Sequence, residues 1–249
     1  MKIRKVLSTI GLISVLSLSI LPTVSNAENV DAFKNASTTG ETTLTEKDFQ
    51  KVKSNLLDMG IDSVTVDNLI VKLENGGVID SDIMSPEQAI DTNEVVEGGL
   101  TTTTYIYPDG SQSQLTVEDN SIVKDNSKIT LFSITDGSCT SGSGYVTCKN
   151  RKIAYTGATY GFSFIANYET ASGAYDQITS ADKWNIWTAG GTYANPKLRI
   201  VQAKENANGK AEARLSGTIT LANSAGAISR SLSLLVGKDA ATDKWNAFY

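Results

Sequence analysis

The sequence contains no histidine among its 249 residues, and this absence excludes much of the usual chemistry of enzymes. Ser-His-Asp hydrolysis, Cys-His proteolysis and zinc catalysis by an HExxH motif all need an imidazole. Acid–base catalysis in this chain would have to rest on carboxylates or other side chains. The composition therefore favours a non-catalytic protein, with an enzyme that uses paired carboxylates as the alternative.

Cysteine is nearly absent as well, with only Cys139 and Cys148 in the chain. They flank a Ser/Gly-rich turn that leads into a short β-prone segment, and an exported protein with two cysteines usually pairs them. We expect a local disulfide that contributes about 2–3 kcal/mol to stability. The spacing is not CxxC and the chain offers no other soft ligand, so the sequence predicts no metal site and no cofactor.

Hydrophobic runs long enough to cross a membrane are also missing. Residues 1–27 instead have the parts of a signal peptide: basic residues at the start, an uncharged apolar stretch from Val6 to Leu21, and small residues that end at Ala27. The stretch is shorter than the about 20 residues of a spanning helix, which favours cleavage before Glu28 over a membrane anchor. We expect a secreted, extracellular protein with no transmembrane segment after cleavage.

Charge is distributed unevenly along the rest of the chain. Residues 28–127 contain 19 acidic and 6 basic side chains, a net charge of −13, whereas residues 128–249 contain 8 acidic and 13 basic side chains, a net charge of +5. All three tryptophans and seven of the nine tyrosines also follow residue 128. This change in composition predicts a domain boundary there. The two modules differ either by chance or because the basic one meets an anionic partner.

The acidic half begins with a polar segment, residues 28–43, which has no periodicity and is expected to be a flexible leader. Residues 44–127 are predicted to form a small module of two helices and a β-hairpin. Thr45 is the expected N-cap of the first helix, with Asp48 three residues later, and Gly60 ends it.

The second helix is expected over Val64–Glu74, where apolar residues recur at three- and four-residue steps. Residues 80–99 are acidic, include Pro86, and are predicted to be a connector or a short helical turn. The segments Thr101–Tyr107 and Gln112–Val117 have strand composition and are separated by a Pro-Asp-Gly-Ser turn, which predicts the β-hairpin.

Residues 128–249 have the composition of short strands with no helix between them. In several of them large apolar residues alternate with small or polar ones, as in strands that bury one face. We therefore expect an α+β protein whose C-terminal domain is an antiparallel β-sandwich that carries the disulfide. The strands are predicted at Lys128–Ile134, Tyr145–Cys148, Lys152–Tyr155, Gly161–Tyr168, Trp184–Ala189, Lys197–Ala203, Ala211–Ala222 and Ala225–Val236.

Several short motifs resemble those of small secreted proteins of Gram-positive bacteria that are known only as domains of unknown function. The resemblance covers most of the chain after the leader and implies export and a β-rich fold, without any catalytic residue. The N-terminal motifs are Met59-Gly60-Ile61, Leu69-Ile70-Val71-Lys72-Leu73-Glu74-Asn75-Gly76, Asp80-Ser81, Ser85-Pro86 and Tyr105-Ile106-Tyr107-Pro108-Asp109-Gly110-Ser111. The C-terminal motifs are Tyr160-Gly161-Phe162-Ser163-Phe164, Tyr175-Asp176-Gln177-Ile178 and Leu234-Leu235-Val236-Gly237.

The candidate binding residues combine aromatic rings and positive charges. Trp184 and Trp187 could stack on sugars, but residues three apart in a strand point to opposite faces, so we expect one in the core and the other outside, near Tyr193. Lys197 and Arg199 share one side of their predicted strand. A wider basic face is predicted from Lys197, Arg199, Lys204, Lys210, Arg214 and Arg230.

These residues lead to three hypotheses for function. The first is a secreted, non-catalytic binding protein of the bacterial surface whose β-domain contacts an anionic cell-wall polymer, host polymer or polysaccharide; nucleic acid is not an expected partner. The second is a glycan hydrolase with carboxylates drawn from Asp176, Asp182, Asp239 and Asp243. The third is a toxin-like factor whose acidic module masks the basic one.

Overall fold

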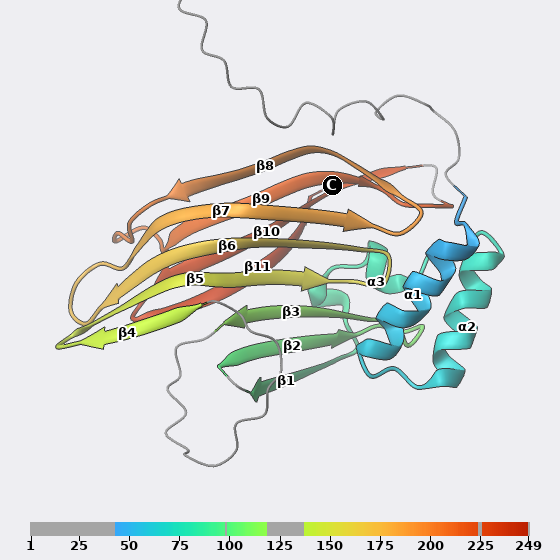
Figure 1. Cartoon of the computed structure of the whole chain (residues 1–249), viewed down its shortest axis with the longest axis horizontal. Helices are drawn as coiled ribbons and strands as arrows, with labels where there is room; N and C mark the ends of the chain where they lie inside the picture. Colours follow the sequence, from blue (N-terminus) through green and yellow to red (C-terminus); the bar gives the residue numbers. More distant parts are fainter. Residues whose placement is uncertain (1–42, 98, 119–136, 224–225, 249) are drawn as a thin grey trace, which may run out of the picture. The chain divides into compact units, whose positions relative to one another are not determined.

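In the computed structural model, the described residues are 43–97, 99–118, 137–223 and 226–248, and they all belong to one compact unit, residues 39–249. The predicted signal peptide, almost all of the leader and the predicted strand at 128–134 lie outside these ranges. Two antiparallel sheets and a few helices N-terminal to them make up the fold (Figure 1), which confirms the α+β class. Within the described ranges, no helix is both long and apolar enough to cross a membrane.

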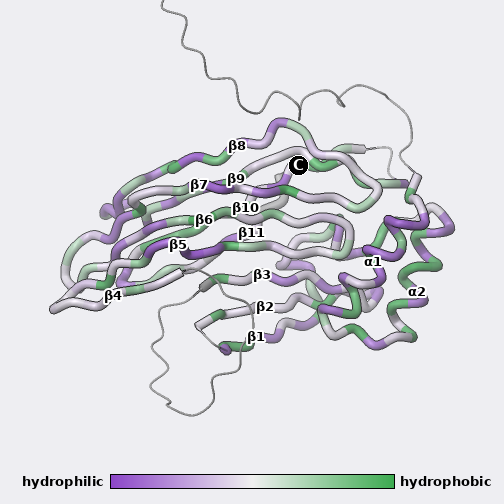
Figure 2. The backbone as a smooth tube through the Cα atoms, viewed as in Figure 1, coloured by the Kyte–Doolittle hydropathy of each residue, from purple (hydrophilic) through white to green (hydrophobic). Residues whose placement is uncertain are grey.

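Two helices form one end of the unit. Helix α1 (Glu46–Asp58) begins at the predicted N-cap: the amide of Asp48 donates to Thr45 Oγ1 (3.3 Å) and the amide of Thr45 donates to Asp48 Oδ2 (2.9 Å). Helix α2 (Ser63–Glu74) is capped by Asp62. Hydrophobic and hydrophilic residues alternate along both helices (Figure 2), and the apolar ones share a core: Val52, Leu56, Val66, Leu69 and Leu73.

The residues between α2 and the predicted β-hairpin form more structure than a connector. A single helical turn, α3 (Asp80–Ile83), and a 3₁₀ turn, η1 (Pro86–Gln88), are followed by strand β1 (Asp91–Glu97), which the sequence analysis missed. All seven residues of β1 are exposed. The strand pairs along its whole length with β2 (Leu100–Ile106), so sheet pairing rather than burial explains why this acidic, polar segment is extended.

The larger sheet, sheet A, has the strand order β1-β2-β3-β5-β6-β7, with β4 paired to β5 outside this path. Its other strands are β3 (Gln112–Glu118), β4 (Ser138–Gly142), β5 (Tyr145–Thr156), β6 (Tyr160–Ala171) and β7 (Gln177–Thr188). Strand β5 covers two predicted strands, and a bulge between Cys148 and Arg151 interrupts its pairing with β6 where Asn150 has a φ of 54°.

Sheet A runs across the predicted boundary between the two modules. Strand β3 pairs with β5, with Leu115 opposite Tyr155 and Val117 opposite Ile153. Leu115 and Val117 are both buried. Strands β1 to β3 are therefore part of the same sheet as the strands that follow residue 128, and Leu115 of β3 belongs to the core that the two sheets share.

The smaller sheet, sheet B, has the order β11-β10-β9-β8. Its strands are β8 (Thr192–Gln202), β9 (Ala211–Thr220), β10 (Ala227–Gly237) and β11 (Ala240–Phe248), the last of which was not predicted. Both sheets contribute to one hydrophobic core. At its centre the Trp245 ring of β11 stacks on the Tyr155 ring of β5, with centroids 3.7 Å apart, so the two sheets face each other.

The helices cover the turns at one end of the sheets. Ala158 of the β5–β6 turn and Ala189 of the β7–β8 turn are buried in the helical core. Asn55 of α1 donates its side-chain amide to the carbonyl of Ala158 (2.9 Å), and Asn223, which follows β9, donates to the carbonyl of Leu73 (2.8 Å). We call this the helical end, and the opposite end, with the β6–β7, β8–β9 and β10–β11 turns, the loop end.

Candidate functional site

A line of basic side chains crosses the outer face of sheet B. The strand register places Arg199 of β8 opposite Arg214 of β9, Arg214 opposite Ser233 of β10, and Ser233 opposite Lys244 of β11. We call these four residues, three of them basic and one a serine, the basic row. The neighbouring row across the same strands, Leu198, Leu215, Leu232 and Trp245, lies in or against the core, so the basic row faces away from it.

The basic row keeps most of its positive charge. Arg214 pairs with Glu212 two residues earlier on the same face (Nε to Oε1, 2.8 Å), and Ser233 donates to the same carboxylate oxygen (2.8 Å). Within the part of the chain that the structure describes, the Arg199 side chain has no hydrogen-bond or ion-pair partner. Arg199 and Arg214 are like charges on directly opposite residues, an arrangement that costs stability.

One further basic group, Lys197, and one acidic group, Glu87, lie near the ends of this row. Lys197, on the same face of β8 as Arg199, is exposed and lies opposite Ser216. At the other end, the pKa of Glu87 in η1 is lowered mainly by its hydrogen bond with Ser85, and the charge of Lys244 also contributes. The face therefore carries four cations against Glu212 and, at its edge, Glu87.

Of the predicted binding residues, the structure brings Lys197 and Arg199 together and separates them from the tryptophans. Trp187 is in β7 of sheet A, opposite Gly161 and next to the buried Ile186, so its ring lies on the outer face of sheet A. Trp184 and Tyr193 are each 41% exposed. The aromatic and basic candidates are thus distributed over both sheets and not over one face.

The predicted surface position of Arg230 is wrong. Its side chain is 1% exposed, because Arg230 is in phase with Leu232 and Leu234, the core-facing residues of β10. The guanidinium donates to the main-chain carbonyls of Asp82 (3.0 Å) and Ile83 (3.2 Å) and to the Tyr160 hydroxyl oxygen (3.1 Å). Arg230 therefore fastens α3 to the sheets and is not available to a ligand.

The α3 turn is held by further buried groups of the helical end. Tyr155 donates its hydroxyl to the carbonyl of Ser81 (3.3 Å), and Tyr160 donates to the carbonyl of Asp82 (3.1 Å). The Asp82 side chain is itself buried, and its Oδ1 has no hydrogen-bond partner. Burial raises the pKa of this carboxyl from 3.8 to about 7, although Thr159 and the charge of Arg230 act in the opposite direction.

The acidic residues proposed for glycan hydrolysis differ in burial and in position. Asp176 is fully buried, and its two carboxylate oxygens accept the main-chain amides of Ala171 (2.8 Å) and Asp239 (2.9 Å). Asp182 is exposed in β7, Asp239 is in the β10–β11 turn, and the side chain of Asp243 lies outside the described part of the structure. Nor do the described residues include a cluster of three or more His, Cys, Asp or Glu side chains suited to a metal ion.

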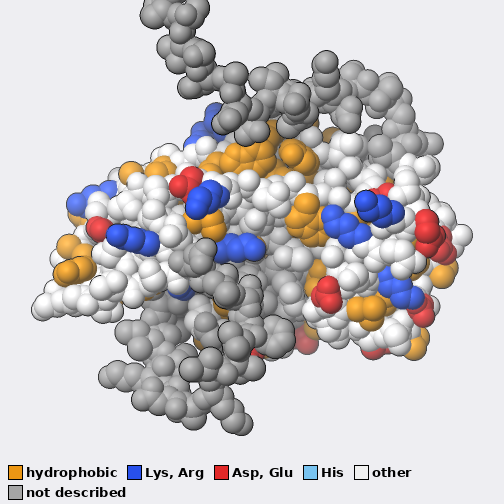
Figure 3. Space-filling model, viewed as in Figure 1, with side chains coloured by type: hydrophobic (Ala, Val, Ile, Leu, Met, Phe, Trp, Pro, Cys, Tyr) orange, Lys and Arg blue, Asp and Glu red, His pale blue; other side chains and the backbone are white. Residues whose placement is uncertain are grey.

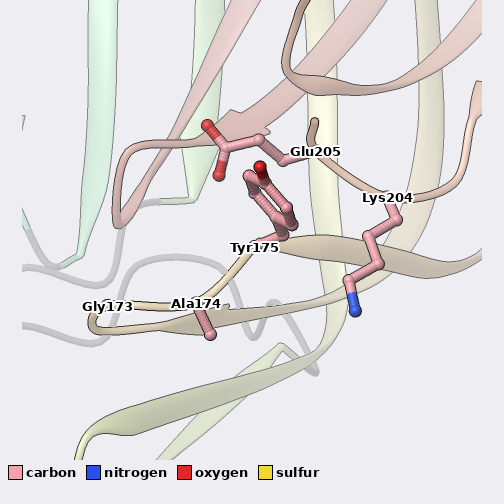
Figure 4. Close-up of a pocket in the computed structure, with 5 residues that line it drawn as sticks. All are labelled: Gly173, Ala174, Tyr175, Lys204 and Glu205. Atoms are coloured by element: carbon pink, nitrogen blue, oxygen red, sulfur yellow. The ribbon is translucent and has the colours of Figure 1, made fainter. Parts of the chain in front are cut away.

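An open hollow of about 630 Å³ lies at the loop end, lined by Gly173, Ala174, Tyr175, Lys204 and Glu205 (Figure 4). Tyr175 is 53% exposed. The Glu205 carboxylate accepts the main-chain amides of Lys238 (3.1 Å) and Asp176 (3.3 Å), so it braces the turns around the hollow. Lys204 of the predicted basic face is here, away from the basic row.

The predicted disulfide is confirmed. Cys139 of β4 is directly opposite Cys148 of β5, and their sulfur atoms are bonded. Cys148 is buried in the main core, where it lies among the apolar residues of both sheets. The bridge therefore joins the short strand β4 to the core and has a structural role.

The sequence matches no protein-family model and no curated protein. Among solved structures, the chain is similar to a hypothetical protein, lmo2686, from Listeria monocytogenes EGD-e. The two are 18% identical, the match covers 59% of this chain and 94% of the other, and the TM-score is 0.31. A likeness this distant carries no argument about fold or function.

Proposed function

We propose that this protein is a secreted, non-catalytic binding protein that contacts an anionic polymer of the bacterial wall or of a host through the outer face of sheet B. The observation that supports the proposal is the alignment of Arg199, Arg214 and Lys244 in one row across the sheet. Arg199 lies opposite Arg214, which is already paired with Glu212, so a ligand anion at Arg199 would offset the repulsion that this pair leaves.

The geometry of the row indicates how such a polymer would bind. Neighbouring strands are about 4.8 Å apart, so the row extends about 14 Å across sheet B. A linear polyanion could lie across the strands and meet the basic groups in succession. Exposed charge pairs are weak and are screened by salt, so affinity would come from several contacts along the polymer and would depend on ionic strength.

The experiment is a pull-down of the mature protein on purified Gram-positive cell walls at low and high salt. We expect retention at low salt and release at high salt. The double variant Arg199→Gln/Lys244→Gln neutralises both ends of the row and should weaken retention by about two- to thirtyfold, since each exposed ion pair contributes about 0.2–1 kcal/mol.

The matched control is Lys47→Gln/Lys149→Gln, which removes the same charge from exposed positions in α1 and β5. It should leave retention unchanged. Absence of retention even at low salt would overturn the proposal. Equal losses in the two double variants would also overturn it, because net charge rather than the basic row would then explain binding.

A further inference from the structure

The outer face of sheet A carries a row of uncharged side chains that crosses all six strands of its main path. The register aligns Asn93, Thr104, Gln114, Thr156, Gly161 and Trp187, in the order β1, β2, β3, β5, β6 and β7. We call this the uncharged row. The next row on the same face, which includes Thr102, Thr116, Ser163 and Asn185, is also uncharged.

This face contrasts with the basic row of sheet B. Figure 3 shows the molecule in the view of Figure 1, with basic side chains scattered over a surface that is largely uncharged. Side-chain hydroxyls and amides of the two rows already bond to one another across strands: Gln114 Nε2 donates to Thr104 Oγ1 (3.3 Å), and the hydroxyls of Thr102 and Thr116 are 3.4 Å apart. The two rows thus offer aligned donors and acceptors that carry no charge of their own.

The uncharged row ends at an aromatic ring that lies on the sheet. A Cβ atom at Gly161 would clash with Nε1 and Cε2 of Trp187, so the indole lies directly on the Gly161 backbone and only glycine permits this approach. The Lys51 ammonium of α1 lies over the same ring, 4.5 Å from its centroid.

The contact between Lys51 and Trp187 is not what holds α1 in place. Val52 and Leu56 bury that helix in the helical core, and Asn55 bonds to the β5–β6 turn. Lys51 also makes a long hydrogen bond to the carbonyl of Thr188 (3.4 Å). An exposed cation–π contact is worth only about 0.5–1 kcal/mol, so a ligand can displace the ammonium at low cost.

We infer that the uncharged row is a second binding site, for a neutral glycan chain, in which a sugar ring stacks on Trp187 in place of the Lys51 ammonium. A pyranose has an apolar C–H face that suits an indole ring and hydroxyls that suit Thr, Gln and Asn side chains. The row offers no charge to an ion. At about 4.8 Å per strand it extends about 24 Å, which is long enough for several sugar units.

This inference is independent of the basic row, because the two rows lie on the outer faces of different sheets. The protein would then bind two polymers of different chemistry, a polyanion on sheet B and a neutral glycan on sheet A. Salt distinguishes the two sites: it screens the contacts of sheet B and leaves stacking and neutral hydrogen bonds largely unaffected.

Calorimetric titration of the full mature chain tests the glycan site, with unbranched hexamers of N-acetylglucosamine and of β-1,4-linked glucose as probes. We expect at least one hexamer to bind, equally at low and high salt. Trp187→Ala should weaken binding about tenfold, and Trp187→Phe, which keeps a ring, should weaken it less. Lys51→Ala should tighten binding about two- to fivefold, because it uncovers the indole.

The control variant is Lys47→Gln, one turn before Lys51 on the same helix, and it should bind as the wild type does. Trp187→Ala should also leave retention on cell walls by the basic row unchanged, so failure of one site is distinguishable from failure of the other. The inference is overturned if neither hexamer binds to wild type or to Lys51→Ala, if Trp187→Ala binds normally, or if high salt abolishes binding.

Discussion

The helical end and the loop end of this protein both bury a charged side chain, and the two charges have opposite signs. At the helical end, Arg230 donates to the main-chain carbonyls of Asp82 and Ile83. At the loop end, Asp176 accepts the main-chain amides of Ala171 and Asp239. The bonded carbonyls belong to the single turn α3, and the bonded amides belong to the last residue of β6 and to the β10–β11 turn.

The difference in sign shows how the fold holds its turns in place: a buried cation bonds to main-chain carbonyls, and a buried anion bonds to main-chain amides. Buried backbone carbonyls and amides must be paired, and a charged partner makes a stronger hydrogen bond than a neutral one. Two hydrogen bonds of one guanidinium fix the α3 turn to sheet B, and a third reaches the Tyr160 hydroxyl of β6. Two acceptors of one carboxylate join the end of β6 to the β10–β11 turn. Both charged side chains are almost fully buried, and three substitutions compare what the two ends contribute to stability.

The largest effect is expected for Arg230→Leu. The change removes three hydrogen bonds, to the Asp82 and Ile83 carbonyls and the Tyr160 hydroxyl, from a site that water does not reach. We expect the free energy of unfolding to fall by about 4–5 kcal/mol in urea denaturation. Arg199→Leu, at an exposed position on the outer face of the same sheet, is the control and should cost about 1 kcal/mol or less. Equal losses would contradict a special role for Arg230.

A smaller loss is expected for Asp176→Ala at the loop end. Two main-chain amides lose their acceptor, which should lower the free energy of unfolding by about 3 kcal/mol. Asp176→Asn keeps one carbonyl oxygen as an acceptor and should lose about half as much. If the asparagine variant is as unstable as the alanine variant, the negative charge rather than the two hydrogen bonds is what stabilises the turns.

The third substitution, Asp82→Asn, should stabilise the protein at neutral pH. Burial raises the pKa of Asp82 to about 7 in the folded state, above 3.8 in the unfolded chain, so the folded protein prefers the neutral carboxyl. The stability of the wild type should therefore fall as the pH rises from about 4 to about 7 and stay constant above that. Because asparagine has no charge to bury, we expect a gain of about 1–2 kcal/mol at pH 8.

Thermal unfolding of both proteins between pH 4 and pH 8 measures this difference. The two curves should meet at the acid end and separate as the pH rises. A variant that is less stable than the wild type at pH 8 would show that the ionised carboxylate is an effective counter-ion for Arg230. The helical end would then depend on an ion pair, and its buried charge would no longer be satisfied by backbone groups as it is at the loop end.

Local signals in the sequence were sufficient to predict the helices and strands whose ends they mark. The pair Thr45 and Asp48 identified the start of α1, and alternation identified β9, whose residues 211–220 alternate between buried and half-buried positions. Strands β1 and β11 were missed for the same physical reason. β1 is acidic and the apolar residues of β11 are mostly alanines, and both are extended because a neighbouring strand pairs with them.

Placing the residues of the candidate sites also required knowledge of which strands pair with each other. Arg230 could have been placed correctly from its phase with Leu232 and Leu234, but a charge in a core position is rare enough that the surface was the natural expectation. Lys244 was not considered because β11 was not predicted. The sequence did not indicate that the Trp187 ring would lie on Gly161, since the two residues are 26 positions apart and meet only through strand pairing.

The stacking of Trp245 on Tyr155 determines the order in which the molecule can be completed during synthesis. Every other described strand leaves the ribosome before β11, yet the ring at the centre of the two-sheet core belongs to β11. A nascent chain that lacks this strand has an open cavity where the indole belongs, and it stays loosely packed. The core is therefore complete only once β11 has been added to sheet B.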